Sequence, residues 1–171
     1  MKLWPILLLA TATLFACSRP PAPEAQQKPG PKIEYQDLKP ETWPVPEEVK
    51  AALPGLQNDN LYVYRDVSPT VNLVASLPQY ARKDAIERCA RAFTALTRDP
   101  KLAAGIDFWI IQVQPEEGNE VLVWGVRPAE AQAYAQTGDL NKFFTESEYL
   151  LVDDKIIPAG PERAAYLNPP P

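Results

Sequence analysis

The feature that most restricts the fold of this chain is a pair of apolar segments separated by a short turn. Residues 106–114 read "IDFWIIQVQ", residues 120–126 read "EVLVWGV", and "PEEGN" lies between them. Segments rich in β-branched and aromatic residues around a Gly-containing turn predict a β-hairpin. Both faces of each predicted strand are apolar, which is typical of strands in the middle of a sheet with both faces covered. We therefore expect a layered domain built around this hairpin.

Strands are also predicted before and after the hairpin. Residues 60–67, "NLYVYRDV", and residues 70–76, "TVNLVAS", have the composition of two antiparallel strands joined by a Ser-Pro turn. Residues 148–158, "EYLLVDDKIIP", predict the last strand of the sheet. The sheet is therefore expected to hold about five strands.

A long helix is predicted from Ser76 to Arg98. Ser76 and Gln79 form a capping-box pattern at its start, and Asp99-Pro100 ends it. Apolar residues recur at spacings of three and four along one face. They are Ile86, Cys89, Phe93 and Leu96. The position of Cys89 on this face predicts a buried structural thiol rather than a reactive one.

Arg82 lies on the same side of the predicted helix as its apolar face. Two interpretations stay open. The side chain extends its charged end to water from the start of the helix, or it reaches a carboxylate or a ligand at the end of the sheet.

Two short helices complete the predicted elements. Pro128 begins an Ala-rich helix that ends at Gly138. Asp139 caps the next helix, in which Phe143 and Phe144 form an apolar ridge. The order β-β-α-β-β-α-α-β predicts an α+β fold, with an antiparallel sheet of about five strands, one long amphipathic helix and two short helices.

The N-terminus has the layout of a secretory signal. Lys2 precedes an apolar stretch that ends at Ala16, and this stretch is shorter than the ~20 residues of a membrane-spanning helix. Leu14, Ala16 and Cys17 occupy positions −3, −1 and +1 of a cleavage site. This pattern resembles the lipobox of bacterial lipoproteins, with Phe15 bulkier than the residue usual at −2.

The resemblance implies a lipoprotein that is cleaved before Cys17 and carries lipid on its thiol. Several acyl chains together hold a protein stably on a membrane, whereas one chain does not. Ser18 follows the cysteine, where inner-membrane lipoproteins of enteric bacteria have aspartate. The resemblance therefore implies a cell-envelope protein, on the outer membrane facing the periplasm rather than on the inner membrane.

Four regions are expected in the chain. They are the signal peptide 1–16, the lipid attachment site and Pro-rich linker 17–46, the globular α+β domain 47–160 and the Pro-rich tail 161–171. Residues 18–46 hold eight prolines and few apolar side chains, a composition that favours a spacer over a core. Trp43 is the exception, and it either docks on the folded domain or recognises a partner.

Charge and composition exclude several functions. The chain has 17 basic and 22 acidic residues and no histidine. Cleavage after Ala16 removes Lys2 alone, which leaves 16 basic residues against 22 acidic ones and a net charge of −6. This balance argues against nucleic-acid binding. Without histidine there is no Ser-His-Asp or Cys-His catalysis and little prospect of a zinc site, so no cofactor, metal or catalytic residue is predicted.

Pairs of carboxylates are the remaining candidates for chemistry. They are Glu116 with Glu117, Asp153 with Asp154, and Glu146 with Glu148. Two carboxyl groups can hydrolyse glycosides without histidine when an apolar pocket keeps one of them protonated. Each pair lies in a predicted turn or exposed end, however, where both groups are solvated.

Two functions from different classes therefore remain. The first is a lipid-anchored envelope protein with a non-catalytic binding or scaffolding domain and an envelope protein as partner. The second is a histidine-free, carboxylate-dependent hydrolase of cell-wall glycan. A pocket with two facing carboxyl groups would favour the second function.

The hairpin offers a surface for a partner. Two short helices are small cover for an apolar sheet, and a large exposed apolar patch on a secreted protein marks an interaction site. We expect the rim of this patch to include Trp109 or Trp124, unless the face is core sealed within the monomer. The loop length leaves the register open, with Trp109 opposite either Trp124 or Gly125.

Overall fold

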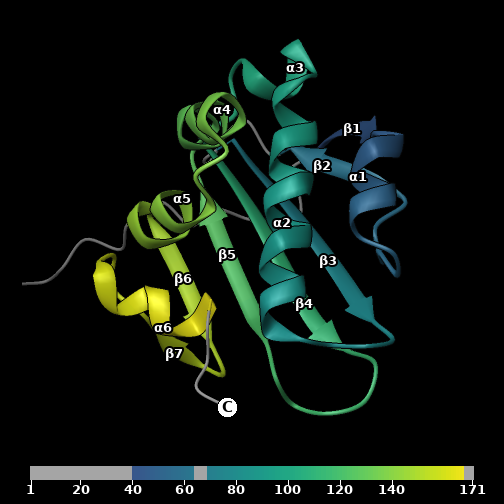
Figure 1. Ribbon diagram of the computed structural model, residues 1–171. Helices are drawn as coiled ribbons and strands as arrows, with labels where there is room; N and C mark the ends of the chain where they lie inside the picture. The colour runs from purple at the N-terminus through teal and green to yellow at the C-terminus, as the bar shows by residue number, and fades with distance from the viewer. Residues whose placement is uncertain (1–39, 64–68, 168–171) are drawn as a thin grey trace, which may run out of the picture. The chain divides into compact units, whose positions relative to one another are not determined.

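The computed structural model describes residues 40–63 and 69–167 and confirms the α+β class (Figure 1). The elements are β1 (Glu41–Pro44), α1 (Glu47–Ala52), β2 (Asn60–Val63), β3 (Thr70–Leu77), α2 (Arg82–Thr97), α3 (Pro100–Ala103), β4 (Phe108–Pro115), β5 (Leu122–Val126), α4 (Pro128–Thr137), α5 (Leu140–Glu146), β6 (Tyr149–Val152), β7 (Lys155–Ile156), the 3₁₀ helix η2 (Pro161–Arg163) and α6 (Ala164–Leu167). The predicted signal peptide and Cys17 lie outside the described residues.

Five strands form the main sheet in the order β3-β4-β5-β6-β7. The predicted hairpin is its centre, with β4 and β5 antiparallel. Trp109 lies opposite Val126, and Trp124 lies opposite Ile111. Neither register considered from the sequence is therefore the one observed, and the two tryptophans are diagonal neighbours on one face.

The predicted antiparallel pairing of residues 60–67 with residues 70–76 is not the pairing observed. β3 runs parallel to β4, and β2 pairs with β1, where Trp43 lies opposite Leu61. The physical reason is the helix α2, which joins β3 to β4 as the crossover that a parallel pair requires. Trp43 is partly buried against the core, which confirms the docking interpretation.

The predicted start of the long helix at Ser76 is also wrong. The in-out alternation of β3 continues to Leu77, so Ser76 is a strand residue and α2 begins at Arg82. The Ser76 hydroxyl accepts a hydrogen bond from Gln57 Nε2 at 2.7 Å instead of capping a helix. The backbone of the segment before β2 covers this outer edge of β3, since Ser76 N donates to Gly55 O at 3.0 Å.

The helices pack on one face of the main sheet, the near face in Figure 1. Trp109, Ile111 and Val113 of β4 point into this layer and are fully buried. The other face is mostly half-buried and only partly apolar, since Gln112 and Gln114 also lie on it. It carries Phe108, Ile110, Val123, Tyr149 and Leu151, together with Ile156, which is 69% exposed.

No helix of the described residues covers that second face, so the two short helices do not supply the second layer that strands with two apolar faces predict. The reason is that α4 packs against α2, and α5 packs against α4, all on the same side. On the second face the Phe108 ring lies directly over Gly125. A Cβ atom at Gly125 would approach this ring to 2.5 Å, so the contact requires glycine.

A fully buried arginine holds the C-terminal segment in place. Arg163 is 1% exposed and donates to four carbonyl oxygens, those of Phe144 at 3.3 Å, Ser147 at 2.7 Å, Ile157 at 2.6 Å and Pro158 at 2.9 Å. Its Nη1 also lies 3.1 Å from Ser147 Oγ, which accepts from Trp124 Nε1 at 2.7 Å. Part of the segment predicted as a tail therefore belongs to the packed domain.

Replacing Arg163 by Met should destabilise the fold strongly. The substitution removes every side-chain donor to these buried carbonyls, and unsatisfied buried groups cost ~1–3 kcal/mol each. We expect a loss of about 2–4 kcal/mol in the free energy of unfolding, measured by chemical denaturation. The matched control is Arg98→Met, because Arg98 is exposed and its ion pair with Glu48 contributes ~0–1 kcal/mol. Equal losses in both variants would contradict this role for Arg163.

The thiol of Cys89 should be protected in the folded chain. Cys89 is fully buried on α2, as the sequence predicts, and burial raises the pKa of this thiol far above its ordinary value. In a chain carrying Cys17→Ser, Cys89 is the only thiol. We expect its reaction with a maleimide to be at least about a hundredfold slower in buffer than in denaturant, because reaction requires opening of the core. Rapid labelling of the native chain would show that the thiol is accessible.

Candidate functional site

A cleft of about 290 Å³ lies between α4 and α5. It is lined by Glu130, Ala133, Tyr134, Thr137, Asp139, Lys142, Phe143, Glu146 and Ser147. A concave site with a mainly apolar surface and a few polar groups is the usual form of a small-ligand site. We therefore take this cleft, called the α4–α5 cleft below, as the candidate functional site.

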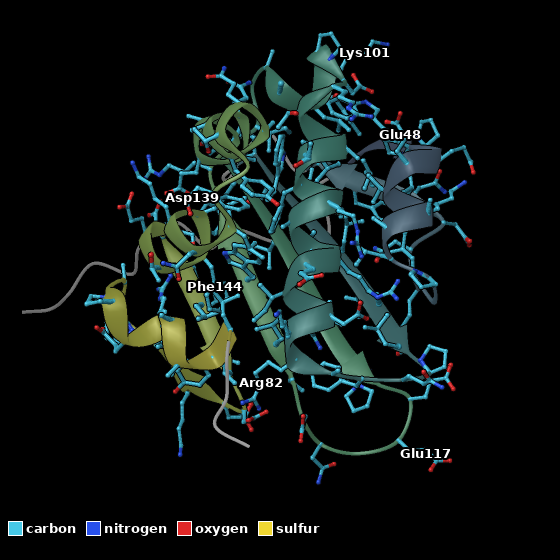
Figure 2. All side chains as sticks on the ribbon, in the orientation of Figure 1. Glu48, Arg82, Lys101, Glu117, Asp139 and Phe144 are labelled. Carbon is cyan, nitrogen blue, oxygen red and sulfur yellow. The ribbon has the colours of Figure 1, made fainter. Side chains whose placement is uncertain are left out.

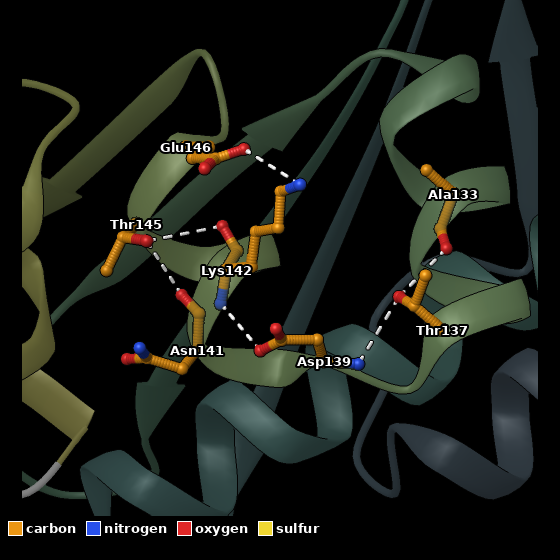
Figure 3. Close-up of polar contacts among 7 residues, drawn as sticks. All are labelled: Ala133, Thr137, Asp139, Asn141, Lys142, Thr145 and Glu146. Atoms are coloured by element: carbon orange, nitrogen blue, oxygen red, sulfur yellow. Dashed lines mark hydrogen bonds and ion pairs between the residues drawn. The ribbon is translucent and has the colours of Figure 1, made fainter.

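The local sequence brings the two helices together through a very short connection. α4 ends at Gly138, whose φ of 68° is the left-handed conformation that glycine adopts most readily at a helix C-terminus. Asp139 follows at once and caps α5, because its carboxylate accepts from Lys142 N at 3.0 Å (Figure 3). Thr137 Oγ1 donates to Ala133 O at 3.0 Å and lies 3.4 Å from Asp139 N. These contacts fix the mouth of the cleft.

Two stacked rings line the cleft. The centroids of Tyr134 and Phe143 are 4.6 Å apart, and the ring planes are 9° from parallel. Phe143 packs in turn on Trp124 at 4.8 Å and on Phe93 at 6.1 Å. Since Trp124 and Phe93 are fully buried, the wall of the cleft is continuous with the core and is held rigidly.

Charged groups form the rim of the cleft. Glu130, Asp139 and Glu146 carry carboxylates, and Lys142 carries the one ammonium among the lining residues. Lys142 Nζ lies 4.0 Å from Glu146 Oε2, and the two side chains are 65% and 66% exposed, so this ion pair is weak (Figure 3). The rim is therefore acidic, with a loosely held internal cation.

Glu130 differs from the other rim carboxylates in its environment. Burial raises the pKa of Glu130 above its ordinary value, although the hydrogen bond from Arg127 N opposes the shift. This bond, 2.8 Å long, places the carboxylate at the first turn of α4 as part of a capping box. Glu130 thus joins the helix start to the edge of the cleft.

The two tryptophans predicted at an exposed rim lie elsewhere. Trp109 and Trp124 have no exposed surface, so that expectation is wrong. The reason is the observed register, which turns both indoles toward the helices. Trp124 packs edge-on against Phe93 and Phe144. Its ring also contacts the ring of Phe143, which lines the cleft. Its contribution to the α4–α5 cleft is structural and indirect.

Figure 2 places Glu117 and Arg82 near the β4–β5 turn, at the opposite end of the sheet from Lys101. Glu116 and Glu117 are exposed in that turn. Asp153 accepts from Val121 N at 3.1 Å and lies 2.8 Å from Arg82 Nη2. The interpretation in which Arg82 reaches a carboxylate is therefore confirmed, and Asp153 has a structural role.

The two carboxylates of the third acidic pair, Glu146 and Glu148, lie in different surroundings. Glu148 forms a bidentate ion pair with Arg127, at the exposed start of α4. Glu146 lies instead on the rim of the α4–α5 cleft and next to Lys142. The structure therefore gives the two carboxylates different cationic partners.

Sequence reasoning predicted both helices of the α4–α5 cleft but not the cleft itself. The available signal was the direct succession of a C-capping Gly138 and an N-capping Asp139, which forces consecutive helices to pack closely. The stacking of Tyr134 on Phe143 depends on the angle between the helices, which local periodicity does not determine.

Neither a metal site in the described residues nor a comparison with known proteins assigns a function to this chain. The part of the chain that the structure describes contains no group of three or more His, Cys, Asp or Glu side chains placed to hold a metal ion. Within the same residues, no helix combines the length and the apolar character needed to cross a bilayer. The chain matches no protein-family model, and the comparison with curated proteins and with solved structures gives no significant match.

Replacing Glu130 by Gln should change the pH dependence of stability. Because the pKa of Glu130 is raised in the folded state, the folded chain holds this proton more tightly than the unfolded chain. The contribution of Glu130 to stability is therefore largest below the unfolded pKa of about 4.3 and falls as pH rises through the higher folded pKa. Gln keeps the capping acceptor for Arg127 N but cannot ionise.

We therefore expect the stability of Glu130→Gln, relative to wild type, to increase from acidic to neutral pH. Denaturant unfolding at several pH values measures this difference. Glu116→Gln serves as the control, because Glu116 is an exposed turn residue with the same change in charge. A difference between Glu130→Gln and wild type that does not vary with pH would contradict the assignment.

Proposed function

We propose that this protein is a lipid-anchored cell-envelope protein whose folded domain binds a partner and does not catalyse a reaction. The observation that carries the anchoring is the succession of Leu14, Ala16 and Cys17 after a short apolar N-terminus. Such a signal places lipid on Cys17, and Ser18 favours the outer membrane, facing the periplasm. The proposed partner is another envelope protein.

The α4–α5 cleft supports the binding part of the proposal. Its surface is mainly apolar, its polar groups converge at the rim, and its aromatic wall is supported by buried rings. Preformed sites of this kind bind with little loss of conformational entropy, because their side chains are already ordered.

The rim also bears on the alternative, a carboxylate-dependent hydrolase of cell-wall glycan. That chemistry uses one protonated carboxyl group and a second carboxylate on either side of the bond to be broken. Here Glu130 and Asp139 accept backbone hydrogen bonds at the starts of α4 and α5, and Glu146 faces Lys142. Glu130 and Asp139 thus serve as helix caps, and Glu146 lies beside a cation, which favours binding over hydrolysis.

The anchor is tested by Cys17→Ser expressed in the native host. Without the thiol no lipid can be attached, so we expect the variant to move from the membrane and detergent phase to the soluble fraction. Fractionation and detergent-phase partitioning measure the change. Cys89→Ser is the control for loss of a thiol and should remain on the membrane, because Cys89 is buried in the domain. A Cys17→Ser protein that partitions as wild type does would disprove lipid anchoring.

Binding is tested by cross-linking the anchored full chain in its own membranes and recovering its partner. Tyr134→Leu removes one ring of the cleft and should reduce recovery of the partner. Tyr62→Leu is the matched control, because Tyr62 is 44% exposed on β2 and does not line the cleft. Equal recovery with both variants would rule out the cleft as the binding site.

A further inference from the structure

The second face of the main sheet, turned away from the viewer in Figure 1, carries no charged side chain on any of its five strands. Lys155 of β7 pairs with Val152 and so belongs to the other face. Charged residues make up 23% of the chain, and a sheet face in water normally carries some of them. The residues of the second face are Thr70, Asn72, Val74 and Ser76 of β3, Phe108, Ile110, Gln112 and Gln114 of β4, Val123 and Gly125 of β5, Tyr149 and Leu151 of β6, and Ile156 of β7.

The second face is flat where it is most apolar. The ring of Phe108 lies against the sheet over Gly125, because a Cβ atom at Gly125 would approach this ring to 2.5 Å. A large aromatic side chain therefore fills a gap in the sheet instead of projecting from it. Two sheets pack face to face at about 10 Å when the side chains between them are short or lie flat.

The polar half of the second face can bond to a copy of itself. Gln112 Nε2 donates to Gln114 Oε1 at 3.2 Å, and Gln114 Nε2 lies 3.5 Å from Ser76 Oγ. An amide carries two N–H donors and a carbonyl acceptor, so each of these groups keeps bonding capacity after one such contact. In a two-fold contact the same patch meets itself, and amides and hydroxyls can then pair, whereas like charges would repel.

The size of the second face fits a weak dimer. Neighbouring strands lie about 4.8 Å apart and rise about 3.3 Å per residue, which gives the five strands a flat area of roughly 400 Å². Two copies packed face to face would cover roughly 800 Å², and more once projecting side chains such as Ile156 are included. This area lies at the lower limit of specific interfaces, where association is reversible.

These observations select one occupant for the second face. The chain has a net charge of −5, so two copies repel each other over most of their surfaces, and the uncharged face is where that repulsion is smallest. A charged partner would find no ion pair there. We propose that the second face is a self-association surface, on which a second copy of this chain packs sheet to sheet. Anchoring of both copies on one membrane would raise their effective concentration.

The proposal is tested by sedimentation velocity of the full-length chain in detergent over a range of concentrations. We expect a reversible dimer with a dissociation constant in the micromolar range. Gln112→Glu adds a negative charge to the second face of each copy with almost no change in shape, and should weaken the dimer at least about tenfold. Gln132→Glu is the matched control, because it makes the same change at an exposed position of α4 and keeps the same anchor.

A mixture of two variants separates an interface from a structural effect. Gln112→Lys alone should also weaken the dimer, but mixed with Gln112→Glu it should restore association, because opposite charges then meet across the contact. Thermal unfolding shows whether each variant is folded at the temperature of the measurement.

Three results would overturn the proposal. They are a chain that stays monomeric at every concentration, equal effects of Gln112→Glu and Gln132→Glu, and a mixture of charge variants that associates no better than either one. A monomer would mean that the chain itself or a different protein covers the second face. The second face is separate from the α4–α5 cleft, so each of these results leaves the test of the proposed function with Tyr134→Leu unaffected.

Discussion

The packing of the C-terminal half of the domain depends on the buried guanidinium of Arg163. A charge removed from water is tolerated only where each of its donors finds an acceptor. Here the acceptors are backbone carbonyls of the segment before η2 and of Ser147, which ends α5. Burial lowers the pKa of Arg163, but the ordinary value for arginine is so high that the group stays charged near neutral pH. One side chain thereby joins α5, the loop after β7 and the C-terminal helices.

The same contacts extend to the α4–α5 cleft. Ser147 receives hydrogen bonds from both Arg163 and Trp124, and it also lines the cleft. From Trp124 the aromatic contacts continue through Phe143 to Tyr134 at the surface. A site supported by buried and hydrogen-bonded neighbours keeps its geometry without a ligand. Loss of Arg163 would therefore affect the cleft as well as the stability of the domain.

The elements that the sequence predicts correctly are those defined by local patterns. The β4–β5 hairpin, the apolar face of α2 with Cys89, and the caps of the short helices all follow from residues close together in the chain. The pairing of β3 with β4 does not, because it depends on how α2 crosses the sheet. The capping-box pattern at Ser76 failed because the strand alternation continued through it and the edge hydrogen bonds of β3 competed for the residue.

Two further features of the structure were beyond local patterns. Arg163 lies in a segment whose prolines and charges are typical of a tail, and only tertiary contacts show that it is buried. The cleft depends on Tyr134 and Phe143, which come from different helices and stack only after these helices pack. Sequence periodicity identifies which side of a helix is apolar, but it does not reveal which part of that side stays accessible.

Charge also connects the proposed anchor with the proposed partner. The chain has a net charge of −5, which disfavours electrostatic binding to anionic lipid, so the proposed membrane attachment would depend on acyl chains. The same negative charge attracts a basic partner over distances of about a Debye length, ~8 Å at physiological ionic strength. Salt would accordingly slow association with a basic partner more than it would speed dissociation.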